Sequence, residues 1–98
     1  MVRWSLRARA DLKAIHDHIA KEAPMNARTV VREIVNRANL IDQTPRGGRK
    51  IPELNDEAIR EIPVYSWRVI YQLRDDAVFI VTLVHKRRAP APEQLRPV

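Results

Sequence analysis

The hydrophobic pattern of this chain is helical from residue 8 to residue 41 and changes its period near residue 45. Before that point apolar residues recur every three or four positions, which indicates amphipathic helices. The first stripe contains Ala8, Leu12, Ile15, Ile19 and Ala23, and the second contains Ala27, Val30, Val31, Ile34, Val35, Ala38 and Ile41. Pro24 cannot continue a helix but suits the first turn of a new one. The pattern therefore predicts a long helical hairpin from about Arg7 to Thr44.

Beyond Pro45 and the pair Gly47-Gly48, a charged surface loop is expected up to Glu57. Three runs rich in valine, isoleucine and aromatic residues follow, at 59–64, 67–73 and 78–85. Their short connections predict an antiparallel meander, sheltered by the helices on one face and partly on the other. A further short strand is expected at 2–5. The predicted fold is α+β, with the order β-α-α-β-β-β and a long helical hairpin packed on a small antiparallel sheet.

The length of the chain, 98 residues, fits one domain spanning 1–98. Three prolines after residue 89 predict an extended, mobile C-terminal tail.

Without cysteine, and with charge close to the first residue, the chain is expected in the cytoplasm and not in a membrane. The net charge of +6 favours an anionic partner. His16 and His18 point in different directions on a helix, so a metal-chelating pair is not expected. No cofactor is expected either.

Several short motifs, by their order and spacing, carry a resemblance to a known family. They are Ala10-Asp11-Leu12, Pro45, Arg46-Gly47-Gly48-Arg49, Trp67-Arg68-Val69-Ile70-Tyr71 and Val84-His85-Lys86-Arg87-Arg88. Together they resemble the RelE/ParE superfamily of toxins from bacterial type II toxin-antitoxin systems. The resemblance implies a cytoplasmic protein that inhibits growth and is neutralised by a cognate antitoxin. The C-terminal segment of such an antitoxin wraps the toxin.

The RelE branch of this superfamily cleaves mRNA on the ribosome. The resemblance gives Arg68 and Arg87 the role of stabilising the scissile phosphate, with His85 as acid or base. The best-known ribonucleases carry two lysines where this chain has Arg60 and Glu61, and a late tyrosine that is absent here. For Arg68 the alternative interpretation is a sheet-face arginine paired with Glu61 or Glu53. For His85 it is a side chain at the surface or at the edge of the core.

The ParE branch acts on DNA gyrase, and its members have a long helical hairpin and lack the ribonuclease residues. This chain has the long hairpin and an incomplete ribonuclease set, so inhibition of gyrase is the leading hypothesis and mRNA cleavage the alternative. A third is a non-toxic basic module that binds RNA or protein. Anion or partner binding is expected at five basic residues, Arg49, Lys50, Arg60, Lys86 and Arg88. The aromatic residues Trp4, Trp67, Tyr71 and Phe79 are predicted to lie in the core.

Overall fold

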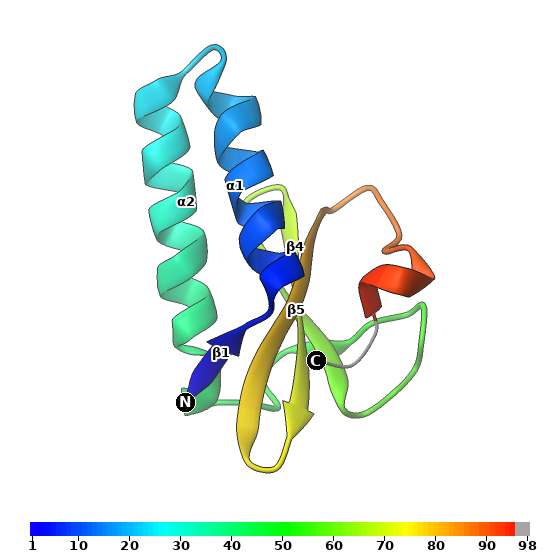
Figure 1. Ribbon diagram of the computed structural model, residues 1–98. Coiled ribbons are helices and arrows are strands. Elements are labelled where there is room, and N and C mark those ends of the chain that lie inside the picture. The colour runs from blue at the N-terminus through cyan, green and yellow to red at the C-terminus, as the bar shows by residue number, and fades with distance from the viewer. Residues whose placement is uncertain (96–98) are drawn as a thin grey trace.

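The computed structural model describes residues 1–95 and contains a helical hairpin lying on one face of a sheet (Figure 1). The elements are β1 (Val2–Trp4), α1 (Leu6–Ala20), α2 (Pro24–Asn39), η1 (Ile41–Gln43), β2 (Arg49–Lys50), β3 (Ile59–Val64), β4 (Trp67–Arg74), β5 (Ala77–His85) and η2 (Pro92–Leu95). The α+β class and the predicted hairpin and meander are confirmed. Neither helix in this part of the chain is long and apolar enough to cross a membrane.

The ends of α1 follow from local chemistry. Ser5 begins the helix, because its hydroxyl oxygen accepts a hydrogen bond from the Ala8 amide at 3.0 Å. The helix ends at Ala20, three residues before the predicted end at Ala23. Ala23 precedes Pro24, whose ring excludes the helical conformation, and Ala23 has φ −145° and ψ 74°. The proline therefore shortens α1 and starts α2.

The sheet differs from the prediction of a purely antiparallel one. Its order is β1-β5-β4-β3-β2, and β1 runs parallel to β5, with Val2 opposite Val78 and Trp4 opposite Ile80. The loop predicted before residue 57 also contains the short strand β2, which pairs with β3. Two residues are too few to show an alternating pattern, and side-chain periodicity does not specify which strands pair.

The main core lies between the helices and the sheet. It includes Ile15, Ile34, Val69, Tyr71 and Ile80, with Trp4 and Trp67 packed against it while partly exposed. Phe79 is an exception to the predicted aromatic core. It lies outside this cluster, half-buried, with the Arg74 guanidinium carbon 4.6 Å from its ring centroid. Phe79 is therefore a surface stacking partner.

A second, smaller core confirms that the other face of the sheet is sheltered. Ile51, Ile59, Ile70 and Val84 are buried there, with Leu95 of η2 packed against them. The prediction of an extended tail is therefore wrong at 92–95, where the chain forms η2 and returns to the sheet. Apolar contact with the second core is the physical reason. Residues 96–98, also part of the predicted tail, lie outside the described residues.

Candidate functional site

A buried ion network lies on the sheet face opposite the helices. Glu61 on β3 and Arg68 on β4 share this face, because the register sets Glu61 opposite Ile70 and Pro63 opposite Arg68. Diagonal neighbours in an antiparallel pair are within reach of long side chains. The exposed fractions of the two side chains are 3% for Glu61 and 9% for Arg68. We call Arg49, Glu53, Glu61 and Arg68 the Arg68 network.

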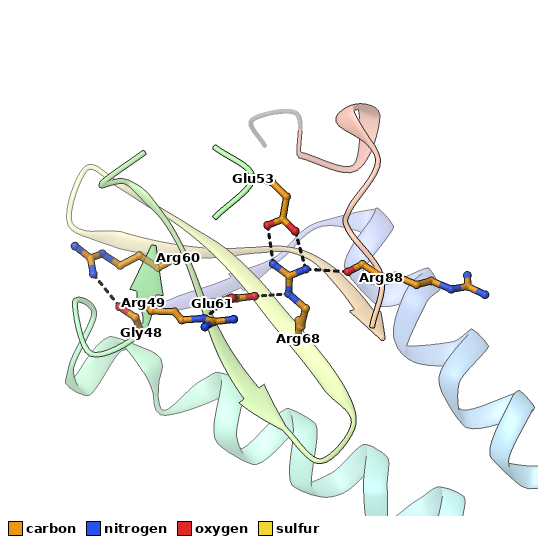
Figure 2. A network of polar contacts seen from close by, with 7 residues as sticks. All are labelled: Gly48, Arg49, Glu53, Arg60, Glu61, Arg68 and Arg88. Carbon is orange, nitrogen blue, oxygen red and sulfur yellow. Dashed lines mark hydrogen bonds and ion pairs between the residues drawn. The ribbon is translucent and has the colours of Figure 1, made fainter. Parts of the chain in front are cut away.

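Figure 2 shows that Arg68 joins three separate segments of the chain. Its Nε donates to Glu61 Oε1, and its Nη1 and Nη2 donate to the two carboxylate oxygens of Glu53 at 3.0 and 2.8 Å. Nη1 also donates to the carbonyl oxygen of Arg88 at 2.8 Å. These contacts confirm the alternative interpretation, in which Arg68 pairs with Glu61 and Glu53. The β4 arginine thereby fixes the loop before β3 and the turn after β5.

The charges in the network compensate one another. Arg49, itself 72% exposed, donates from Nε to the second oxygen of Glu61 at 2.6 Å. Two carboxylates thus face two guanidinium groups. The hydrogen bond to Glu53 raises the pKa of Arg68 above its usual range, against the opposing effect of burial. The same hydrogen bond lowers the pKa of Glu53. A phosphate would have to displace a carboxylate to reach the Arg68 guanidinium.

The depressed pKa of Glu53 predicts a pH-dependent contribution to stability. Because the folded-state pKa lies below the ordinary value of 4.5, this contribution is fully present above pH 4.5. It is lost as the pH falls through the folded-state pKa. Urea unfolding from pH 7 to pH 3 should show the parent protein more stable than Glu53→Gln near neutrality, with the difference shrinking below pH 4.5. A difference that stays constant over this range would contradict the assigned role of Glu53.

Three of the five basic residues predicted to bind anions have partners within the protein. Arg60, with 12% of its side chain exposed, binds the Glu57 carboxylate and donates to the carbonyl of Gly48 at 2.8 Å. Lys50 lies 3.3 Å from the other oxygen of Glu57. Arg49 is shared with Glu61. Of these three, Arg60 is held most completely, and it fixes the loop that leads into β2.

The other two of these five residues, Lys86 and Arg88, lie at the end of β5 on either side of Arg87. Lys86, Arg87 and Arg88, which we call the basic turn, are exposed, and none of the three side chains forms an ion pair within residues 1–95. His85 precedes them, with its ring edge-on to Trp67 at 5.3 Å between centroids. Its Nδ1 accepts from the Arg87 amide at 3.2 Å. The basic turn is therefore the exposed cationic surface of this end of the sheet.

The structure separates two residues of the predicted catalytic set. His85 lies opposite Trp67 on the helix side of the sheet, whereas Arg68 points to the other face. Side chains alternate between the two faces along a strand. Trp67 and Arg68 are adjacent on β4, so they point to opposite faces of the sheet. The proposed acid or base and the proposed phosphate ligand are thus on opposite sides of β4 and β5.

No three His, Asp or Glu side chains within residues 1–95 gather to hold a metal.

Sequence reasoning assigned no role to Asp11, although it lies in one of the matching motifs. Its Oδ2 accepts from the Thr82 hydroxyl and, at 3.1 Å, from the Leu83 amide. A helical carboxylate thus binds the backbone of β5. The available signal was an acidic residue directly beside the apolar stripe of α1, between Ala8 and Leu12.

Comparison with known proteins gives consistent matches over most of the chain. Residues 2–90 match the family model described as the ParE toxin of the type II toxin-antitoxin system parDE. Toxin RelE2 of Caulobacter vibrioides is 34% identical over 88 residues, which cover 89% of this chain and 96% of that protein.

Among the solved structures that share the fold are two from toxin-antitoxin systems. One, from the chromosomal ParDE toxin-antitoxin system of P. aeruginosa, has a TM-score of 0.74 and 22% identity, covering 86% of this chain and 92% of that one. The other, from the toxin-antitoxin complex RelBE2 of Mycobacterium tuberculosis, has a TM-score of 0.60 and 20% identity, covering 87% and 88%. At these identities the likeness concerns the fold.

Proposed function

Because this chain belongs to the ParE toxin family of type II toxin-antitoxin systems, we propose that it arrests bacterial growth by acting on DNA gyrase. A cognate antitoxin holds it silent until that antitoxin is lost. The two solved structures described above both come from toxin-antitoxin systems, which supports an antitoxin partner.

The choice of target rests on one observation: the Arg68 guanidinium is occupied by partners within the protein. Its guanidinium donates to two carboxylates and a carbonyl, and its side chain is 9% exposed. A ribonuclease would need this cation to face the scissile phosphate. His85 lies on the opposite face of the sheet, so the acid or base that the resemblance implies does not lie beside Arg68. These two facts favour a toxin that acts through protein contacts over one that cleaves RNA.

The test is a supercoiling assay with purified gyrase and relaxed plasmid. We expect the protein to inhibit supercoiling and to increase linear DNA, the product of double-strand breaks. Equimolar antitoxin should restore supercoiling. Unimpaired supercoiling at a stoichiometric excess of the protein would reject gyrase as the target.

A ribosome-dependent ribonuclease is the second candidate, because the relative from Caulobacter vibrioides is named RelE2. In that case Arg87, exposed in the basic turn, would contact the phosphate. Primer extension on a translated mRNA distinguishes the two candidates. We expect no codon-linked cuts; cuts that disappear in Arg87→Ala would favour the ribonuclease.

A further inference from the structure

One side of α2 carries hydrogen-bond donors and no carboxylate. Its residues follow one another at steps of four, four and three positions, and all four are exposed: Arg28, Arg32, Asn36 and Asn39. Residues three or four positions apart are neighbours on one side of a helix. We call these four residues the donor stripe. It runs along α2 for about 16 Å, given the rise of a helix per residue.

The donor stripe lies on the outside of the molecule. The buried residues of α2 are on the other side of the helix, at Ala27, Val30, Ile34 and Ala38. Figure 1 shows α2 at the margin of the molecule, with the turn that joins it to α1 beyond the ends of the strands. The stripe is therefore accessible to a partner as large as a macromolecule.

The positive charges of the stripe are not compensated within the described part of the chain. Neither Arg28 nor Arg32 forms an ion pair within residues 1–95. Glu33 is the one acidic residue of α2, and as the residue after Arg32 it is rotated by about 100° around the helix. An anionic partner would therefore meet two cations without a neighbouring carboxylate on the same side.

Trp4 determines which part of the Asn39 amide is available. The indole Nε1 can only donate, and it donates to the side-chain oxygen of Asn39 at 3.1 Å. The group that remains for a partner is the NH2 of this amide. Guanidinium groups also donate without accepting, so the stripe matches a surface of anionic acceptors.

The distribution of apolar residues distinguishes a nucleic acid from a protein as this partner. Protein interfaces have an apolar centre and a polar rim. Here the centre is polar, because the exposed apolar residues Met25 and Leu40 lie beyond the two ends of the stripe. Interfaces with DNA are more polar and more positively charged, and arginine and asparagine are among the side chains that contact phosphate.

We propose that the donor stripe binds the phosphate backbone of duplex DNA, so that the toxin contacts the DNA on which gyrase acts as well as gyrase itself. This contact rests on the proposed action on gyrase. Arg28 and Arg32 each neutralise a phosphate, and the amides of Asn36 and Asn39 donate to phosphate oxygens. Phosphates are alike in every sequence, so the contact positions the protein without selecting a DNA sequence.

Fluorescence anisotropy with a labelled DNA duplex, in the absence of gyrase, tests the contact. Arg28→Ala combined with Arg32→Ala should bind the duplex about 10-fold or more weaker than the parent protein, since two charge-assisted contacts are lost. The slope of log affinity against log salt concentration should become shallower by about 2, because each phosphate contact contributes about 0.9 to it. Replacing both arginines by lysine should retain the slope, since lysine also neutralises phosphate.

The matched control removes two positive charges elsewhere, by combining Arg3→Ala with Arg74→Ala. Both side chains are exposed; Arg3 is opposite Phe79 in the register, and Arg74 stacks on the Phe79 ring. Val78 and Ile80 face the helices, so Phe79 and its neighbours lie on the other face of the sheet. This pair should bind DNA nearly as well as the parent, because charges beyond about one Debye length are screened. Thermal melts establish that all variants fold.

The outcomes separate this inference from the proposed function. Equal affinity and equal salt dependence of the two alanine pairs would overturn the donor stripe, whether or not gyrase is inhibited. Equal or tighter binding of an RNA duplex of the same sequence would overturn DNA as its partner. In the supercoiling assay, half inhibition should need about 10-fold more of the Arg28 and Arg32 pair than of the control pair. If the parent binds DNA through the stripe but leaves supercoiling unimpaired, the gyrase proposal fails and the DNA contact stands.

Discussion

Arg68→Ala is expected to lower the free energy of unfolding by about 3 kcal/mol, because it leaves a buried carboxylate short of its partner. Glu61 is 3% exposed and would keep only Arg49, on one of its two oxygens. Glu53 would lose both of its hydrogen bonds from the guanidinium. Urea unfolding at pH 7, followed by tryptophan fluorescence and circular dichroism, measures the change.

Arg49→Ala is the matched control for this prediction. It removes an arginine from the same carboxylate, but Arg49 is 72% exposed, so the loss should stay within about 1 kcal/mol. Adding Glu61→Leu to Arg68→Ala should restore part of the stability, since no uncompensated charge then remains on β3. Equal losses for Arg68→Ala and Arg49→Ala would show that the buried position of Arg68 has no special importance.

Gly48→Ala is expected to lower the free energy of unfolding by about 2 kcal/mol or more, because the site has no space for a methyl group. A Cβ at residue 48 would lie 2.4 Å from the Tyr71 hydroxyl oxygen and 2.6 Å from the Glu61 carbonyl oxygen. Tyr71 cannot easily move aside, since its hydroxyl donates to the Pro45 carbonyl at 2.7 Å and accepts from the Gly48 amide. The midpoint of urea unfolding reports this loss.

Gly47→Ala provides the comparison at the neighbouring position. The three atoms nearest to its Cβ would all belong to Thr44, the closest at 3.1 Å, and that loop is exposed and can adjust. Neither glycine has a positive φ, so the difference between the two variants measures space and not backbone strain. If both substitutions cost the same, the close contact with Tyr71 is not what limits residue 48.

The sequence predicted those parts of the fold that local periodicity determines. The helical stripes from Ala8 to Ile41 gave the hairpin, and the apolar runs after residue 58 with their short connections gave the meander. Parallel pairing of β1 with β5 could not be predicted, because it joins residues such as Val2 and Val78 that no local pattern relates. η2 was not predicted, because the prolines indicated an extended tail. Leu95 packs against the second core, and no local pattern indicates this tertiary contact.

The site was predicted less completely than the fold. Arg68 and its two carboxylate partners were named among the alternatives, since an arginine on a sheet face requires a counter-charge. His85 faces the opposite side of the sheet from Arg68 because of the strand register. The sequence alone did not establish that register. The role of Asp11 depends on α1 crossing the end of β5, a tertiary contact without a local signal.

The parallel pairing of β1 with β5 also sets the order in which the chain can assemble during synthesis. The hairpin of α1 and α2 makes contacts between residues close in sequence, so it can form early. β1 has no strand to join until Ala77–His85 has left the ribosome, because its partners are Val78 to Ile80. Until then Val2 and Trp4 lack the sheet that shelters them, and the nascent chain carries helices without a finished core. A nascent chain that stops before β5 therefore cannot complete the toxin fold.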